Sequence, residues 1–160
     1  MYINRATKGV YEFGSVFKTF TIAAGFNEKL IEPNDMFNDL EKKIKCGGRT
    51  ISEYDEDLSQ NLSVEEILIN SGNIGSVKIG QKLGVDKIRN FLNQIGILGE
   101  IKFDITEIGT PIPFNWGKCK LLTVSFGHGI TTTLLQLAKG YAIISNGGFN
   151  ITPTLVKKIN

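Results

Sequence analysis

The fold of this chain follows from one segment, Tyr11-Glu12-Phe13-Gly14-Ser15-Val16-Phe17-Lys18. Its pattern predicts a helix from Ser15 to about Leu30, with apolar residues spaced for one buried face. Positions i and i+3 of a helix lie on the same face, so the Ser15 hydroxyl and the Lys18 amine can meet. A hydroxyl is a weak nucleophile until a base removes its proton, and a lysine can be that base. The pair indicates serine acyl-transfer chemistry, whereas the alternative for Ser15 is an ordinary helix cap.

Further motifs follow in a fixed order. They are Asn70-Ser71-Gly72-Asn73-Ile74-Gly75, Thr123-Val124-Ser125-Phe126-Gly127-His128-Gly129-Ile130 and Tyr141-Ala142-Ile143-Ile144-Ser145-Asn146-Gly147-Gly148. The ordered set resembles the transpeptidase domain of penicillin-binding proteins. Its flanks YEFGSVFKTFTIA, NSGNIGSVKIGQKLG and SFGHGI are similar to the class B, division-specific type.

The resemblance implies an α+β fold, the β-lactamase/transpeptidase-like sandwich of helices on an antiparallel sheet. Residues 1–160 would form part of one such domain. A membrane anchor and a linking domain are expected upstream, and a Lys-Thr-Gly strand downstream, since neither Lys-Thr-Gly nor Lys-Ser-Gly occurs in the sequence. Because that strand would supply part of the oxyanion hole, we expect the isolated chain to be inactive.

The resemblance also implies roles for four residues. Ser15 would be the nucleophile and Lys18 its base, which must be neutral and hence buried or close to other cations. Ser71 would relay a proton between Lys18 and the leaving amine, and Asn73 would hold the substrate backbone. Without the resemblance, Lys18 would be a solvated helix lysine, and Asn-Ser-Gly-Asn an ordinary turn.

The implied function is peptidoglycan D,D-transpeptidation during septum synthesis, through an acyl ester on the serine. Expected partners are stem peptides ending in D-Ala-D-Ala, β-lactams as inhibitors, and a glycosyltransferase with other membrane proteins of the division machinery. No cofactor or metal is implied. The enzyme domain would lie on the periplasmic side of the bacterial inner membrane. The alternatives are a β-lactamase or D,D-carboxypeptidase using the same serine, and a catalytically inert scaffold relative.

Composition agrees with an ordinary globular domain and gives no argument for nucleic-acid binding. The chain has 160 residues, 41% of them hydrophobic, and a net charge of +2 with interspersed signs. For Cys46 and Cys119, two unpaired, partly buried thiols are favoured over one disulfide. His128, the single histidine, is expected to be structural or peripheral. The acidic run Asp55-Glu56-Asp57 is expected to be a solvated loop.

Elsewhere the sequence predicts short strands and loops over residues 31–61 and a helix from the capping box at Ser63 to about Asn70. A helix over 74–83 should end at Gly84, and another, capped by Asp86, should reach Gln94. Residues 96–120 should be irregular. The remaining predictions are a short strand over 121–126, a helix over 131–145 and a strand beginning at Ile151.

Overall fold

The computed structural model describes residues 2–157, which fall into two compact units. The first contains the described residues up to Glu12, Asn90–Pro113 and those from Ile130 onwards; the second contains Phe13–Arg89 and Phe114–Gly129.

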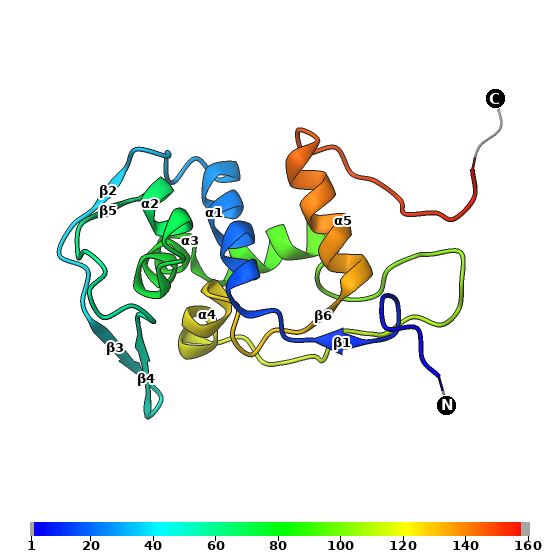
Figure 1. Ribbon diagram of the computed structural model, residues 1–160, viewed down its shortest axis with the longest axis horizontal. Helices are drawn as coiled ribbons and strands as arrows, with labels where there is room; N and C mark the ends of the chain where they lie inside the picture. The colour runs from blue at the N-terminus through cyan, green and yellow to red at the C-terminus, as the bar shows by residue number, and fades with distance from the viewer. Residues whose placement is uncertain (1, 158–160) are drawn as a thin grey trace. The chain divides into compact units, whose positions relative to one another are not determined.

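The second unit carries most of the helices (Figure 1). A short 3-10 helix, η1 (Gly14–Phe17), leads directly into α1 (Lys18–Asn27). The other helices are α2 (Val64–Ile69), α3 (Asn73–Gln94) and α4 (Lys118–Ser125). The last residues of α3, from Asn90, belong to the first unit.

Two antiparallel ladders complete the second unit. One pairs β2 (Met36–Phe37) with β5 (Leu62–Ser63), the strand that leads into α2. The other is a hairpin of β3 (Lys43–Cys46) and β4 (Arg49–Ser52), turned at Gly47 and Gly48. Both glycines have positive φ, as the tight turn between two such strands requires.

The core of the second unit forms where the apolar faces of its helices meet. Phe17, Phe20 and Ala24 are buried, as the helical spacing predicted, and the two rings pack edge to face with centroids 5.3 Å apart. At Gly80 of α3 a β-carbon would lie 1.8 Å from Ser125 Oγ of α4, so a glycine is needed for this close approach.

The first unit is built from β1 (Val10–Tyr11), which pairs antiparallel with β6 (Thr132–Thr133), and from α5 (Leu134–Ser145). Thr133 and Gln136 form a capping box at the start of α5. The buried Gln136 amide also donates to the carbonyls of Gly96 (3.0 Å) and Gly99 (2.9 Å), so it anchors the irregular segment after α3.

Several predicted elements are confirmed. The capping box of Ser63 and Glu66 begins α2, and α5 ends at Ser145 as expected. The predicted break at Gly84 is also confirmed, because its φ of 75° and ψ of 170° are non-helical and divide the segment labelled α3 into two helices that meet at a kink. Asp86 lies two residues after this break.

Three predictions are wrong. Residues 121–126 belong largely to α4, not to a strand, because Leu121, Leu122, Val124 and Ser125 form one buried helical face. Residues 151–157 form no strand; the rest of that predicted strand, 158–159, lies outside the described residues.

The third error concerns the cysteines. Cys46 of β3 and Cys119 of α4 are joined in a disulfide, with Cα atoms 5.4 Å apart. The two cysteines are 73 positions apart in the sequence, so only tertiary packing brings them together. The bond fastens the β3–β4 hairpin to α4.

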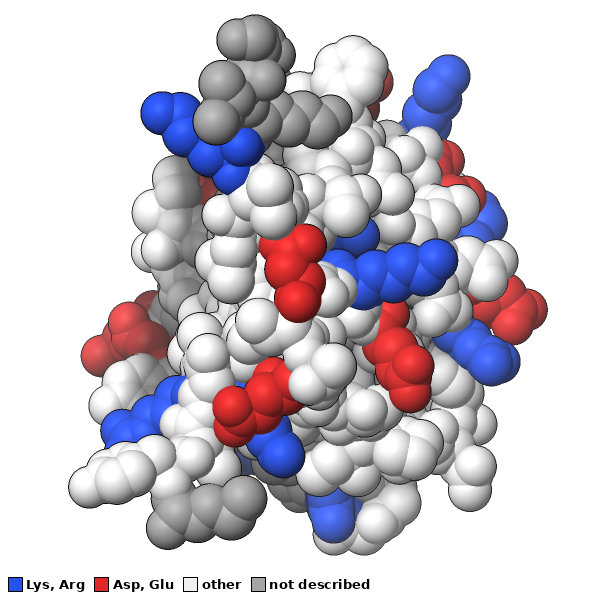
Figure 2. All heavy atoms as spheres, turned by 90° about the vertical axis from the view of Figure 1, so that its right-hand side faces the viewer, with Lys and Arg blue, Asp and Glu red and all other residues white. Residues whose placement is uncertain are grey.

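The described surface carries charges of both signs. Figure 2 shows acidic and basic side chains interspersed among uncharged ones on one face, in line with the small net charge of +2. Over residues 2–157, no helix combines the length and apolarity that crossing a bilayer requires.

Candidate active site

Ser15 and Lys18 lie on consecutive turns of one helical segment. Ser15 is exposed in η1, directly after Gly14, whose φ of 58° turns the chain into the helix. The backbone N–H of Lys18 donates to the Ser15 carbonyl, which closes the 3-10 turn. Side chains at i and i+3 eclipse one another in a 3-10 helix, so the two residues share a face.

The Lys18 side chain is buried and reaches the second motif. Its exposure is 2%, which is unusual for a lysine. Its Nζ donates a hydrogen bond of 2.8 Å to Ser71 Oγ and a second to the Ser71 carbonyl oxygen. These bonds join two motifs 53 residues apart in sequence.

Burial lowers the pKa of Lys18 from its ordinary 10.5 to about 8, because an ammonium loses its hydration there. The negative charge of Glu53 acts in the opposite direction and raises this pKa. At pH 7 about a tenth of Lys18 is therefore neutral and able to accept a proton. The residue thus meets the requirement for a general base.

The second motif forms a tight turn between α2 and α3. Ser71 has a φ of 53°, in the left-handed region, and its N–H donates to the Leu68 carbonyl. Ser71 is exposed to solvent, and its Oγ is the atom that accepts the hydrogen bond from Lys18 Nζ. Two residues later Asn73 begins α3, and its side-chain Nδ2 donates to the Ser52 carbonyl at 2.8 Å.

The segment around His128 packs against the chain directly before Ser15 through a neighbouring glycine. Gly127 packs so closely that a β-carbon there would lie 1.8 Å from the Gly14 carbonyl oxygen. It therefore fixes the backbone immediately before Ser15. His128 itself is exposed and stacks on the Phe126 ring with centroids 6.1 Å apart. A structural or peripheral role for it stays a prediction.

The structure thus brings Lys18 and Ser71 into contact and places Ser15 one turn before Lys18. The Asn73 amide is directed to β4, and substrate binding by Asn73 stays a prediction, as do the catalytic roles of the other three. Sequence reasoning missed Glu53, whose carboxylate contacts the N-terminus of α3. In the sequence Glu53 stands at the start of an acidic stretch, 53–57, within a segment predicted only as short strands and loops, so no local pattern singled it out.

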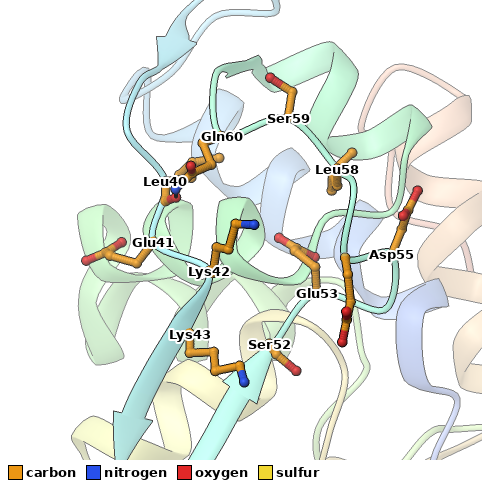
Figure 3. Close-up of a pocket in the computed structure, with 11 residues that line it drawn as sticks. Leu40, Glu41, Lys42, Lys43, Ser52, Glu53, Asp55, Leu58, Ser59 and Gln60 are labelled. Carbon is orange, nitrogen blue, oxygen red and sulfur yellow. Dashed lines mark hydrogen bonds between the residues drawn. The ribbon is translucent and has the colours of Figure 1, made fainter.

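The second unit contains two cavities of moderate size. One of about 230 Å³ is lined by Glu53 and the loop that follows it (Figure 3). The other, about 180 Å³, is lined by the disulfide together with Arg49, Lys120 and His128. Within residues 2–157, His, Cys, Asp and Glu side chains form no cluster that could hold a metal ion.

Comparisons with known proteins agree with this geometry. The whole chain, residues 1–160, matches the family model of the penicillin binding protein transpeptidase domain. It is 30% identical over 158 residues to the probable peptidoglycan D,D-transpeptidase FtsI of Caulobacter vibrioides, covering 98% of this chain and 26% of that protein. It is 31% identical over 148 residues to the probable peptidoglycan D,D-transpeptidase PenA of Neisseria flavescens, covering 91% and 36%.

A solved structure shows the same fold. The apo transpeptidase domain of penicillin-binding protein 3 from Burkholderia pseudomallei superposes with a TM-score of 0.89 at 25% identity, covering 98% of this chain and 48% of that one. The predicted α+β fold class is therefore confirmed. The chain spans less than half the length of each of these three proteins.

Proposed function

Since this chain belongs to the transpeptidase family of penicillin-binding proteins, we propose that it forms part of a peptidoglycan D,D-transpeptidase that acts through a serine acyl-enzyme. The observation that carries the proposal is the buried Lys18 amine, which is bonded to Ser71 Oγ and shares a helical face with the exposed Ser15. A nucleophile and a base of lowered pKa on one rigid helix are the parts that acyl transfer needs.

In the acylation step, Ser15 Oγ attacks the carbonyl carbon of the terminal D-Ala-D-Ala peptide bond while neutral Lys18 takes its proton. The C–N bond then breaks, and the departing D-alanine amine receives a proton from Lys18 through the Ser71 hydroxyl. Ser71 suits this relay because its oxygen both accepts and donates hydrogen bonds. Asn73 holds the backbone of the donor peptide in the same cleft.

In the second step, an amine of a neighbouring stem peptide attacks the Ser15 ester and releases the serine. The new amide is the cross-link between the two strands of peptidoglycan. A β-lactam enters by the first step, because its strained amide acylates Ser15, and it inhibits by blocking the second step.

We place the active enzyme in a longer protein that acts at the division septum, anchored in the inner membrane with this domain on the periplasmic side. Its partners there are a glycosyltransferase and other division proteins. The Cys46–Cys119 disulfide supports this location, because such bonds persist in oxidising compartments like the periplasm. A Lys-Thr-Gly strand elsewhere in that protein completes the oxyanion hole, so residues 1–160 alone are inactive.

The test is to incubate the full-length protein that carries residues 1–160 with a labelled penicillin and to map the adduct by mass spectrometry. The expected result is a stable adduct on Ser15 that Ser15→Ala abolishes. The matched control is Ser59→Ala, which removes a hydroxyl from an exposed loop of the same unit and should leave the adduct unchanged.

Two outcomes contradict the proposal in different ways. Rapid hydrolysis of the adduct, with turnover of the penicillin, indicates a β-lactamase or carboxypeptidase. A folded protein with neither adduct nor turnover indicates an inert relative that keeps the fold without the chemistry.

A further inference from the structure

The N-terminus of α3 is capped by a residue that is distant in sequence. Glu53 Oε2 accepts a hydrogen bond from the backbone N–H of Asn73 at 2.5 Å, and Oε1 accepts one from that of Ile74 at 2.7 Å. The first N–H groups of a helix lack partners within the helix, and the helix dipole favours a negative charge at this end. One carboxylate therefore satisfies two of them.

Glu53 occupies a place that a local cap would otherwise fill. The residue before Asn73 is Gly72, which has no side chain to accept these bonds. A β-carbon at Gly72 would lie 3.7 Å from Glu53 Oε1, so the carboxylate lies directly beside the empty capping position. A residue such as aspartate at position 72 would carry an acceptor of its own for this end of the helix. Here Glu53, directly after β4, supplies that acceptor.

The end of β4 and the second motif are thereby joined by three hydrogen bonds. Two involve the Glu53 carboxylate, and the third runs from Asn73 Nδ2 to the Ser52 carbonyl. β4 itself is held by its pairing with β3, which the Cys46–Cys119 disulfide fastens to α4. The turn that carries Ser71 thus rests on a fixed support.

This support bears on Lys18 in two ways. Ser71 has a left-handed φ, which a serine keeps only when the surrounding structure holds it there. Its carbonyl oxygen and its Oγ both accept hydrogen bonds from Lys18 Nζ. The Glu53 charge also opposes the effect of burial on Lys18. Other charged residues line the same cavity as Glu53, and Figure 3 labels four of them: Glu41, Lys42, Lys43 and Asp55. Glu56 is the fifth.

We propose that Glu53 is a positioning residue of the acyl-transfer site: its carboxylate caps α3, where Gly72 offers no capping side chain, and so holds the Ser71 turn against Lys18. Its negative charge also favours the protonated form of the Lys18 amine. The cap rests on the contacts alone, whereas its effect on the reaction rests on the proposed function. Glu53 acts through Ser71 and Lys18 rather than by touching the substrate.

The first test measures the cap itself on the 160-residue chain by NMR. The Asn73 and Ile74 amide protons should resonate downfield, because both are donated to a carboxylate over short distances, a result that needs no variant. In Glu53→Gln these two amides should exchange with solvent about tenfold faster or more, the equivalent of one lost charge-assisted hydrogen bond. Glu56→Gln, the same charge change on the same loop, should leave them unchanged. Amides that exchange at the same rate in the wild type and in Glu53→Gln overturn the proposal.

The second test measures the effect on the reaction, as penicillin acylation of the full-length protein across pH. Glu53→Gln should slow acylation and move the acidic limb of its pH profile to lower pH, because removing a negative charge favours neutral Lys18. If Glu53→Gln lowers the acylation rate without moving the acidic limb of the pH profile, Glu53 has only a structural role. That result would overturn the proposed effect of its charge on Lys18. If the wild type is not acylated at all, the proposed function fails, while the exchange rates of the Asn73 and Ile74 amides still decide whether Glu53 caps α3.

Discussion

Lys18 shows at the scale of one residue how stability and reactivity oppose each other. Its ammonium is deprived of water by burial, which costs free energy in the folded state. Two hydrogen bonds to Ser71 and the charge of Glu53 offset part of that cost. The cost that is not offset lowers the pKa of Lys18 to about 8, so that part of the amine is neutral and able to accept a proton near neutral pH.

This balance predicts a pH dependence of stability. The pKa of Lys18 is about 8 in the folded chain and near 10.5 when unfolded, so between these values the unfolded chain holds a proton that the folded one has lost. The free energy of unfolding contributed by Lys18 therefore rises with pH from about 8 to about 10.5 and is lowest below 8.

The measurement is urea unfolding of the wild type and Lys18→Met at several pH values. The difference in unfolding free energy, wild type minus variant, should increase across that window, since other titrating groups cancel. Lys102→Met, at an exposed loop lysine, should give a flat difference. A flat difference for Lys18→Met as well would mean that its amine is hydrated in the folded chain.

At the scale of secondary-structure elements, α4 connects the hairpin to the helical core. Cys119 near its start is bonded to β3, and Ser125 at its end packs against Gly80 of α3. The disulfide links α4 to β3, β3 pairs with β4, and Glu53 directly after β4 bonds to the first residue of α3, so these contacts connect α4 to the start of α3. The helix α4 therefore helps to hold the turn that carries Ser71.

Removing the disulfide should therefore lower stability. A bond that closes a loop of 73 residues is expected to contribute about 4 kcal/mol, chiefly by restricting the unfolded chain. We expect dithiothreitol and the double variant Cys46→Ser/Cys119→Ser to lower the urea midpoint by the same amount, and the reductant to have no effect on that variant.

Alkylation provides the independent check. Wild-type chain unfolded without reductant should gain no iodoacetamide adduct in its mass, and two after reduction. Two adducts without reduction would show that both thiols are free, as the sequence alone had favoured.

At the scale of the whole molecule, both units leave large apolar side chains exposed to solvent. In the first unit three large side chains after α5 remain exposed: Phe149 (75%), Leu155 (69%) and Val156 (66%). Exposed apolar groups close in sequence favour association or aggregation.

We therefore expect the 160-residue chain to self-associate with increasing concentration. Sedimentation velocity should show the average mass rising above 17.6 kDa, and the triple variant Phe149→Ser/Leu155→Ser/Val156→Ser should remain closer to the monomer. Tyr54→Ser, which removes an aromatic side chain that is 99% exposed in the second unit, is the control. Equal association of the triple variant and the wild type would locate the contact elsewhere.

Local patterns in the sequence predicted most of the helical framework. The capping box at Ser63, the glycine at position 84 and the apolar spacing of Phe17, Phe20 and Ala24 each act over a few residues, so they can be identified without tertiary contacts. The strand predicted over 121–126 failed because a short apolar run fits a helix and a strand equally well. In the structure the segment is a helix whose Ser125 packs closely against Gly80.

The sequence by itself determined the family, the fold class and the candidate residues, because ordered motifs with their flanks are local and specific. Only the tertiary structure joined Lys18 to Ser71, Cys46 to Cys119 and Glu53 to the start of α3. Each of these contacts joins residues that are 20 or more positions apart. Hydrogen bonds, disulfides and charge interactions depend on distances in space, and packing alone sets those distances between segments that are remote in the chain.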